Sequence, residues 1–189
     1  MHVALAGGAT VVQLREKNVS SAELLEIAHT VHKLTLAAGV PLIINDRIDI
    51  ALAVMAEGVH LGQSDLPLHI ARKILGPKAI IGVSAKTIDQ ARAAAVGGAD
   101  YLGVGAVYGT TTKKDAVSIG LDGFSKIRAV VDLPLVAIGG ISHGERARDV
   151  MACGADGVAV VGAIFDTEDI EAATQRLVVD IAAARSFTR

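Results

Sequence analysis

The stretch LIINDRIDIALAVMAEGVHL, residues 42–61, decides the fold that we predict for this chain. It opens with an apolar run from Leu42 to Asn45, continues with a segment of helical period from Arg47 to Ala56, and ends with a second apolar run from Val59 to Leu61. Short strands that are apolar throughout, instead of alternating with polar residues, indicate burial on both faces. Two such strands joined by a helix predict a parallel βαβ unit with a right-handed crossover.

The same order of strand and helix extends in both directions along the chain. Five more strands are predicted at Thr10 to Leu14, Ile80 to Ser84, Tyr101 to Val104, Leu135 to Ile138 and Gly157 to Val161. Further helices are predicted between Ser20 and Gly39 and at Leu68 to Leu75, Thr87 to Val96, Phe124 to Val131, Gly144 to Met151 and Glu168 to Ala184. A Rossmann sheet would carry a Gly-x-Gly-x-x-Gly turn after its first strand, and the sequence has none there. We therefore predict a closed barrel.

The predicted fold is α/β, a (β/α)8 TIM barrel that forms a single phosphate-binding domain over residues 1–189. Barrels of this kind have eight strands and rarely fall below about 200 residues. Seven strands are predicted here, and the sequence opens inside what reads as the first helix. We therefore expect that the first strand is missing from this chain, or that the barrel closes imperfectly at that place.

Composition narrows the classes of function. Hydrophobic residues make up 51% of the chain and aromatic residues 3%, so we expect a core of Ala, Val, Ile and Leu. The net charge of -2, without a cluster of basic and aromatic residues, argues against nucleic acid as a partner. Cys153 is the only cysteine, which excludes a disulfide framework. No apolar run reaches the roughly 18 residues of a membrane span and the start lacks the basic region of a signal peptide, so we expect a cytoplasmic protein without membrane contacts.

Polar residues at the carboxyl ends of the strands are candidates for the functional site, because parallel barrels bind their ligands there. The first cluster is Gln13-Leu14-Arg15-Glu16-Lys17, in which the strand period of two places Gln13, Arg15 and Lys17 on one face. A bidentate Arg beside a point-charge Lys suits a diphosphate. The alternative is a solvated strand end with ordinary surface charges.

Two carboxylates follow the next two strands. Asp46 comes directly after Asn45, and Asp65 ends the run Gly62-Gln63-Ser64-Asp65. Because adjacent parallel strands end side by side, we expect the two carboxylates to be neighbours, and such oxygens suit Mg²⁺ that is bound mainly by water and by ligand phosphate. Taken singly, Asp46 is equally well interpreted as a helix cap and Asp65 as a turn residue.

Two further regions suggest the binding of an anion. The loop Thr110-Thr111-Thr112-Lys113 offers three hydroxyls and an ammonium, although a loop of this composition is more often plain solvated surface. The glycines of Gly139-Gly140 and Gly162 let backbone N–H groups approach a phosphate, and the alternative is that they only make tight turns.

Ser84 lies at another strand end, where no Ser-His-Asp order is apparent, so we interpret it as a hydrogen-bonding group. His60 lies within a predicted strand. A buried histidine with satisfied hydrogen bonds is a more common case there than a catalytic one.

Taken together, these motifs resemble the thiamine-phosphate synthase family along nearly the whole chain. The matching segments, in the family's order, are Gln-Leu-Arg-Glu-Lys at 13–17, Asn45-Asp46, Gly62-Gln63-Ser64-Asp65, Gly82-Val83-Ser84, Thr110-Thr111-Thr112-Lys113 and Gly139-Gly140-Ile141. The resemblance implies a transferase that joins an aminopyrimidine diphosphate to a thiazole phosphate and releases pyrophosphate, with Mg²⁺ as its cofactor. It further implies that pyrophosphate leaves first, and that the thiazole nitrogen captures the resulting pyrimidine-methyl cation.

The resemblance also implies roles for single residues. Contacts to the pyrimidine diphosphate are implied for Gln13, Leu14, Arg15, Glu16, Lys17, Asn45, Ser84 and Lys113. Contacts to the thiazole phosphate are implied for Thr110, Thr111, Thr112, Gly140, Val161 and Gly162. Asp46 and Asp65 would hold Mg²⁺, and the implied catalytic residues are Arg15, Lys17, Ser84 and Lys113.

Three features depart from the family pattern. Gly109 stands where the family usually has Pro, Gly162 stands where it has Ser, and the first strand is missing. One rival interpretation is a thiazole tautomerase-like barrel, which release of pyrophosphate would exclude. Another is a non-catalytic barrel that binds thiamine phosphate without turnover. Assembly into a homo-oligomer is left open.

Overall fold

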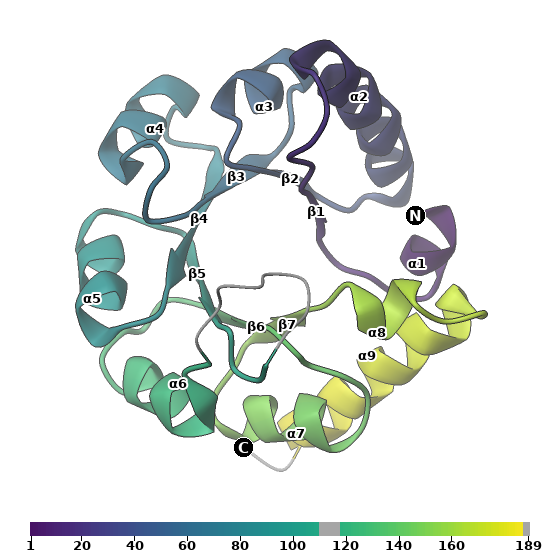
Figure 1. Cartoon of the computed structure of the whole chain (residues 1–189), viewed down its shortest axis with the longest axis vertical. Helices are drawn as coiled ribbons and strands as arrows, with labels where there is room; N and C mark the ends of the chain where they lie inside the picture. Colours follow the sequence, from purple (N-terminus) through teal and green to yellow (C-terminus); the bar gives the residue numbers. More distant parts are fainter. Residues whose placement is uncertain (110–117, 187–189) are drawn as a thin grey trace.

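A curled parallel sheet surrounded by helices forms the body of the computed structural model, which describes residues 1–109 and 118–186 (Figure 1). The strands are β1 (Val12–Leu14), β2 (Leu42–Asn45), β3 (Gly58–Leu61), β4 (Ile80–Ala85), β5 (Tyr101–Gly105), β6 (Leu135–Ile138) and β7 (Gly157–Ala159). Their order in the sheet is their order in the sequence, and every pairing is parallel. β1 and β7 have one strand neighbour each. The prediction of a TIM-barrel-like fold that lacks a strand is therefore confirmed.

The helices cover the outside of the sheet. They are α1 (His2–Ala6), α2 (Ser21–Ala38), α3 (Ile48–Val54), α4 (Leu68–Leu75), α5 (Ile88–Val96), α6 (Gly120–Arg128), α7 (Glu145–Ala152), α8 (Gly162–Phe165) and α9 (Ile170–Ser186). Ser20 caps α2 by accepting a hydrogen bond from the Glu23 amide, and Thr87 caps α5 through the Gln90 amide. Among the described residues, no helix has the length and apolar character that crossing a membrane requires.

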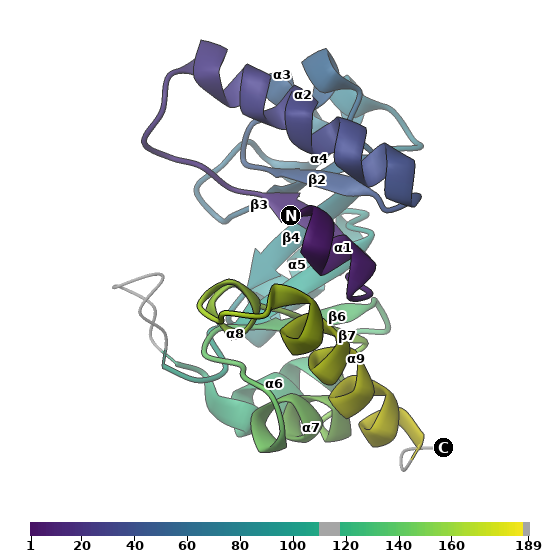
Figure 2. The ribbon, with the colours of Figure 1, turned by 90° about the vertical axis from the view of Figure 1, so that its right-hand side faces the viewer.

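α1 closes the outer layer where the two edge strands lie. It contacts both α2 and α9, and Figure 2 shows it in the space between them. A Cβ atom on Gly7, directly after α1, would lie 2.6 Å from the Thr174 Cβ of α9. The end of α1 therefore packs against α9 at a distance that only glycine permits.

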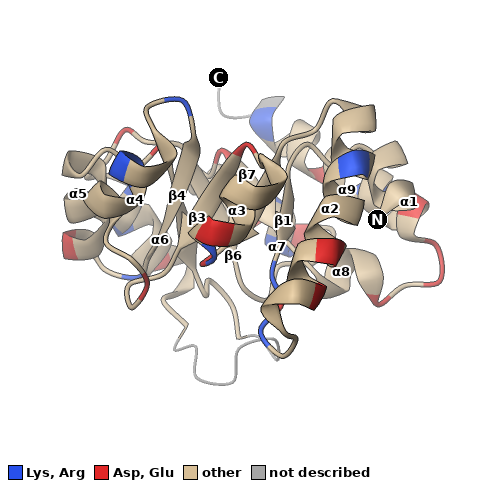
Figure 3. Ribbon diagram, turned by 90° about the horizontal axis from the view of Figure 1, so that it is seen from above, with Lys and Arg blue, Asp and Glu red and all other residues tan. Residues whose placement is uncertain are grey.

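The core lies between the outer face of the sheet and the helices. One group of buried side chains belongs to the half around β2 and β3 and includes Leu42, Ile44 and Val59. A second group belongs to the half around β5 and β6 and includes Leu102 and Phe124. In the ribbon of Figure 3, positions of basic residues and positions of acidic residues are both spread over the helices and loops.

Three carboxylates recur at the amino ends of alternate strands. Glu57, Asp100 and Asp156 directly precede β3, β5 and β7, and each accepts a hydrogen bond from a backbone N–H near the start of the preceding strand. The donors are Leu42 at 2.7 Å, Ile81 at 2.7 Å and Leu135 at 2.8 Å. Each carboxylate also contacts a side chain of the helix that leads into the donor's strand. Glu57 lies 3.3 Å from His32 of α2, Asp100 lies 2.6 Å from Arg72 of α4, and Asp156 lies 3.2 Å from Arg128 of α6. These contacts tie the strands in pairs.

The edge strands and one helix differ from the sequence prediction. β1 begins at Val12 instead of Thr10, and β7 ends at Ala159 instead of Val161. Both strands pair on one side alone, so fewer ladder bonds are available to extend them. α6 spans Gly120–Arg128 instead of Phe124 to Val131, because the chain turns after Arg128, whose guanidinium donates to the Val131 carbonyl.

Candidate functional site

The residues singled out by the sequence gather at the carboxyl ends of the strands. All strands are parallel, so these ends lie on one side of the sheet. Gln13, Asn45 and Ser84 belong to β1, β2 and β4, and Asp46 and Asp65 lie in the loops after β2 and β3. The loop Thr110-Thr111-Thr112-Lys113 lies outside the described residues.

The carboxylate of Asp46 is held by the loop after β1. Lys17 Nζ lies 3.0 Å from Asp46 Oδ2. Asp46 has a φ of 63°, and its backbone N–H donates to the His60 carbonyl at 2.9 Å. A non-glycine residue in the left-handed region is uncommon and marks a constrained position. The alternative that Asp46 caps α3 is wrong, because Arg47 occupies the N-cap position and no side-chain hydrogen bond caps this helix.

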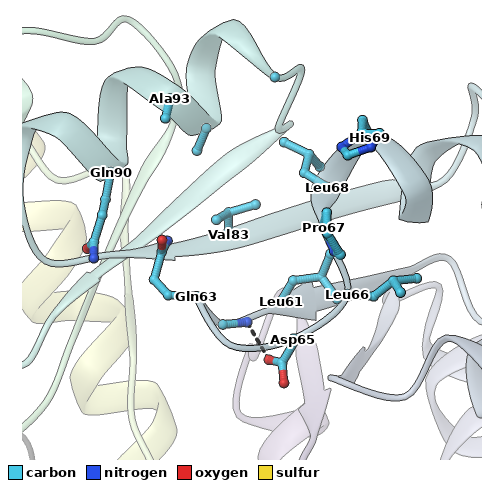
Figure 4. Close-up of a pocket in the computed structure, with 13 residues that line it drawn as sticks. Leu61, Gln63, Asp65, Leu66, Pro67, Leu68, His69, Val83, Gln90 and Ala93 are labelled. Carbon is cyan, nitrogen blue, oxygen red and sulfur yellow. Dashed lines mark hydrogen bonds between the residues drawn. The ribbon is translucent and has the colours of Figure 1, made fainter.

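Asp65 closes the turn after β3 and also faces Asp46. Its Oδ2 accepts a hydrogen bond from the Gly62 N–H at 2.6 Å, a contact drawn in Figure 4. A Cβ on residue 62 would stand 2.9 Å from that oxygen, so Gly62 leaves room for the carboxylate. Asp65 is therefore both the predicted turn residue and a neighbour of Asp46.

The two carboxylates interact strongly enough to titrate as a pair. Burial raises the pKa of Asp65, and its hydrogen bond with Asp46 raises it further. Burial opposes ionisation of Asp46 as well, but the hydrogen bonds with Asp65 and Lys17 outweigh it, so the pKa of Asp46 is lowered. Asp46 thus ionises more readily than an ordinary aspartate and Asp65 less readily, as expected for two like charges at close range.

This donor set fits Mg²⁺. Carboxylate oxygens are the ligands that Mg²⁺ prefers, and it is commonly held by one or two of them together with water and substrate phosphate. Among the described residues, no group of three or more His, Cys, Asp or Glu side chains is arranged to hold a metal. Asp46 and Asp65 would therefore supply the protein ligands, and the remaining positions would be left to water and to the phosphate groups of a ligand.

The loop after β1 differs from the extended strand that the sequence suggested. β1 ends at Leu14, whose side chain packs against the core, so Arg15, Glu16 and Lys17 lie in a loop. Glu16 Oε1 accepts the backbone N–H groups of Lys17 at 2.7 Å and Asn18 at 2.8 Å, and these bonds lower the pKa of Glu16. Arg15 is exposed and acts on Asp46 through space. Glu16 thus shapes the loop from which Lys17 contacts Asp46.

A chain of polar side chains lies inside the sheet next to these residues. His60 on β3 is buried, with 7% of its surface exposed. Its Nδ1 lies 3.0 Å from the Tyr101 hydroxyl on β5, and its Nε2 lies 2.8 Å from Ser84 Oγ on β4. The prediction that His60 is a buried histidine with satisfied hydrogen bonds is confirmed, and Tyr101 is a further polar residue here that the sequence motifs do not indicate.

The glycine-rich ends of β6 and β7 form the other side of the site. Gly139 and Gly140 have φ values of 97° and 65°. A Cβ on Gly140 would stand 2.3 Å from the Gly109 carbonyl oxygen, so only glycine fits there. Arg146 donates to the Gly140 carbonyl at 2.8 Å, and its guanidinium lies 4.9 Å from the centre of the Tyr108 ring.

Gly162 begins the short helix α8, and Val161 before it is exposed. Gly162 is not among the glycines with positive φ. A Cβ at this position would stand 2.5 Å from Asp166 Oδ2, so a carboxylate lies where a larger side chain would project.

A cleft of about 320 Å³ lies beside the turn that carries Asp65. It is lined on the sheet side by Leu61 and Val83 and on the α5 side by Gln90 and Ala93. Figure 4 shows the Asp65 carboxylate turned toward the Gly62 amide, on the opposite side of the turn from Gln90. The cleft is also lined by Asp65 and Gln63, so it borders the polar residues described above.

The fold defines a protein of the TIM-barrel type that lacks a strand, and its candidate site lies at the carboxyl ends of the strands. The profile of the thiamine monophosphate synthase family matches residues 1–164. A thiamine-phosphate synthase of Moorella thermoacetica is 55% identical over 175 residues, which is 92% of this chain and 83% of the relative. One of Chloroflexus aurantiacus is 52% identical over 178 residues, which is 94% of this chain and 82% of the relative.

Comparison with a solved structure indicates the same family. The thiamine phosphate pyrophosphorylase from Pyrococcus furiosus superimposes with a TM-score of 0.90 at 43% identity, covering 97% of this chain and 88% of that chain. The chain belongs to the thiamine monophosphate synthase family. The resemblance found in the sequence is thereby confirmed.

Proposed function

We propose that this chain is a Mg²⁺-dependent thiamine-phosphate synthase, a transferase that joins an aminopyrimidine diphosphate to a thiazole phosphate and releases pyrophosphate. Relatives with this name are about half identical over most of the chain. The observation that carries the assignment of the site is the pairing of Asp46 with Lys17 at 3.0 Å, beside Asp65. It joins a cation to two carboxylates, which is the combination that a metal-bound diphosphate needs.

The diphosphate is assigned to the loop after β1. Lys17 already lies against the carboxylate pair, and Arg15 stands near enough to act on Asp46. Both cations would bind the diphosphate oxygens, Arg15 with a fork of two N–H groups and Lys17 as a point charge. Lys113 is assigned to the same ligand on the strength of the family motif.

The aminopyrimidine ring is assigned to the interior of the sheet. Ser84 on β4 hydrogen-bonds to the buried ring of His60, and Gln13 and Asn45 lie on β1 and β2 at the same end of the sheet. Their amide and hydroxyl groups can hydrogen-bond a heterocycle, whereas the cations lie at the rim. The ring would therefore lie deeper than the diphosphate.

The thiazole phosphate is assigned to the ends of β6 and β7. Backbone N–H groups around Gly140, Val161 and Gly162 would bind the phosphate, together with hydroxyls of Thr110, Thr111 and Thr112 as the family motif suggests. Backbone donors at a glycine-rich turn and a helix start are a common solution for phosphate.

The proposed chemistry requires charge stabilisation and no general base. The bond between the pyrimidine methylene carbon and the diphosphate oxygen breaks, and its electron pair leaves with pyrophosphate. The lone pair of the thiazole nitrogen then forms the new C–N bond to the methylene carbon. Mg²⁺ held by Asp46 and Asp65 would neutralise charge on the leaving group when bound. Arg15, Lys17 and Lys113 stabilise the same charge from the protein side, and the site orients the two substrates.

An assay of both products tests this proposal. Purified protein is incubated with the two substrates and Mg²⁺, and pyrophosphate and thiamine phosphate are quantified. Asp46→Asn and Asp65→Asn should each lower turnover about tenfold or more and raise the Mg²⁺ concentration needed. Asp122→Asn is the matched control, because Asp122 forms an exposed pair with Lys126 on α6.

The outcomes separate the rival functions. Full turnover in chelator by the two aspartate variants would remove the metal assignment. Thiazole isomerisation without pyrophosphate release would point to a tautomerase, and tight binding of thiamine phosphate without turnover would point to a binding protein. The cytoplasmic location and the assembly into a homo-oligomer stay predictions.

A further inference from the structure

We infer that Arg146 is a positioning residue that holds the Gly140 carbonyl and thereby directs the Ile141 N–H toward an anion at the turn after β6. The inference rests on the proposed function, which places the thiazole phosphate at the end of this strand. Arg146 belongs to α7 and to none of the motifs from which the site was predicted.

The turn after β6 is packed against the part of the chain that follows β5. The Val107 N–H donates to the Ile138 carbonyl at 2.9 Å, and the Tyr108 N–H donates to the Gly139 carbonyl at 3.0 Å. A Cβ on Gly139 would stand 2.5 Å from the Ala106 Cβ, so the two backbones approach more closely than a side chain at this position would permit. The segment after β5 therefore lies directly against one side of the turn.

The turn itself offers backbone donors. Gly139 and Gly140 both have a positive φ, which a residue with a side chain rarely adopts. Within the part of the chain that the structure describes, neither the Gly140 N–H nor the Ile141 N–H donates to an acceptor. Successive backbone N–H groups at such a turn form a concavity that binds anions. An anion at this place would therefore satisfy two donors that the described chain leaves unpaired.

Arg146 links this turn to the segment after β5. It lies in the first turn of α7, and its side chain donates to the Gly140 carbonyl at 2.8 Å. The same guanidinium lies 4.9 Å from the centre of the Tyr108 ring. A guanidinium at this distance is attracted to the face of an aromatic ring. The Tyr108 ring therefore helps to keep the guanidinium at the Gly140 carbonyl.

The bond from Arg146 fixes the orientation of the peptide that follows Gly140. In a trans peptide, the C=O and the N–H of the next residue point in opposite directions. Because the Gly140 carbonyl points to the Arg146 guanidinium, the Ile141 N–H points away from it. Glycine has more conformational freedom than other residues, so without this bond the peptide is free to turn over and to present its carbonyl oxygen instead. That oxygen would repel the anion that the N–H binds.

The rival explanation is a direct contact between Arg146 and the phosphate, since the guanidinium has further N–H groups to donate. The two explanations differ in what they require of Tyr108. A positioning role depends on the Tyr108 ring, because the ring helps to keep the guanidinium at the Gly140 carbonyl. A direct contact requires only a cation within reach of the phosphate, so loss of the ring would leave it intact.

The first measurement is a titration of the complete chain with inorganic phosphate, followed through the ¹H–¹⁵N resonances of Gly140 and Ile141. Both resonances should shift in the original protein. In Arg146→Ala the dissociation constant for phosphate should rise about tenfold, as expected for loss of a hydrogen bond from a charged group. Arg148→Ala is the matched control, because it removes a cation from the same helix that pairs with Asp180 instead. Its dissociation constant should stay within about twofold of the original.

The second measurement is calorimetric binding of two ligands, the thiazole phosphate and the thiazole alcohol that lacks the phosphate. Arg146→Ala should weaken binding of the phosphate about tenfold and binding of the alcohol by less than about twofold, since only the phosphate uses the turn. Tyr108→Leu should weaken binding of the phosphate about threefold, whereas Tyr108→Phe keeps an aromatic face and should retain most of the affinity. The double variant of Arg146→Ala and Tyr108→Leu should bind the phosphate no more weakly than Arg146→Ala alone, because both changes remove one arrangement.

An Arg146→Ala protein that binds inorganic phosphate as the original does would overturn the inference, and this result decides even if Tyr108→Leu does not fold. A folded Tyr108→Leu protein with full phosphate affinity, beside a weakened Arg146→Ala, would establish the direct contact instead. Equal weakening in Arg148→Ala would show a general effect of charge and would also overturn the positioning role. Failure of the proposed function looks different, because the protein would then form no thiamine phosphate while the Gly140 and Ile141 resonances still respond to inorganic phosphate.

Discussion

Replacing Gly162 by serine tests the proposed phosphate site at the end of β7. The family pattern has serine at this position, and Gly162 has no positive φ, so the backbone can accept a side chain. The obstacle is Asp166, because the new Cβ would stand 2.5 Å from its Oδ2 and 3.4 Å from its Cγ. Asp166 is exposed, so its carboxylate can turn toward solvent.

The size of the effect follows from two opposing contributions. A hydrogen bond from the serine hydroxyl to a charged phosphate contributes about 1.5 to 3 kcal/mol. Forcing Asp166 into another side-chain conformation costs roughly 1 kcal/mol. The remaining gain of about 0.5 to 2 kcal/mol corresponds to about twofold to thirtyfold tighter binding of the thiazole phosphate. In Gly162→Ser with Asp166→Ala the cost disappears, so the double variant should bind more tightly than the single one.

Calorimetric titration with each substrate measures these changes in affinity, and thermal unfolding checks that the variants are folded. The affinity for the pyrimidine diphosphate should stay within about twofold, because its proposed site lies at β1 to β4. A folded double variant with unchanged thiazole-phosphate affinity would refute the placement of that phosphate at Gly162. A shift in pyrimidine affinity alone would mean that the two substrates are assigned the wrong way round.

Three further predictions concern the carboxylates and the cations. Asp65→Asn should raise Tm at pH 7 by roughly 1 to 3 °C in metal-free buffer. The pKa of Asp65 is raised in the folded protein, so the ionised carboxylate lowers the free energy of unfolding above that pKa and does not do so at low pH. Calorimetry at pH 7 and pH 4 should therefore show a smaller gain in Tm at pH 4. Arg15→Lys should lower kcat/KM for the pyrimidine diphosphate about tenfold or more, because Lys cannot copy a two-pronged contact, and steady-state kinetics equal to those of the original protein would show that Arg15 is ordinary surface. Asp156→Ala should lower Tm by roughly 4 to 8 °C in differential scanning calorimetry, because it leaves the Leu135 N–H without its hydrogen-bond acceptor. A change in Tm as small as that of Asp122→Ala would show that the carboxylate does not stabilise the pairing of β6 with β7.

Local patterns were sufficient to predict most of the fold. Apolar runs predicted all seven strands, and the helices predicted to begin at Ser20 and Thr87 are α2 and α5, which these two residues cap. The two edge strands were predicted too long, because the strand propensity of residues such as Thr10 and Val161 does not depend on how many neighbouring strands are present. Strand length at an edge depends on pairing, which is a property of the complete sheet.

The candidate site was predictable in its parts but not in its connections. Adjacent strand ends placed Asp46 beside Asp65, and the structure bears out that proximity. The pairing of Lys17 with Asp46 depends on the shape of a loop, which a strand period of two could not give. Glycines within predicted strands, at 82 and 103, were the available signal for the His60 and Tyr101 rings, since an interior strand glycine indicates that another group approaches.

Glu57, Asp100 and Asp156 also show how the sheet could be taken apart. Each joins an even strand to the odd strand that follows, whereas the residues before β4 and β6 are Ala79 and Pro134, which have no carboxylate to offer. Strand pairs β2–β3, β4–β5 and β6–β7 are therefore each joined by a carboxylate near their amino ends as well as by backbone, whereas β3 and β4 are joined by the hydrogen bond between His60 and Ser84.

The start of the chain repeats this unit with one substitution. Gly8-Ala9-Thr10 corresponds to Gly98-Ala99-Asp100, and the Ala9 N–H donates to the Ala4 carbonyl as the Ala99 N–H donates to that of Ala94. Threonine takes the acidic position at β1, where no strand precedes it in the sheet. Three pairs of neighbouring strands thus share one arrangement of carboxylate and amide. Chimaeras with a relative should be joined between β5 and β6, because a junction within one of the three strand pairs would separate a carboxylate from the amide that it holds, and a junction between β3 and β4 would separate His60 from Ser84.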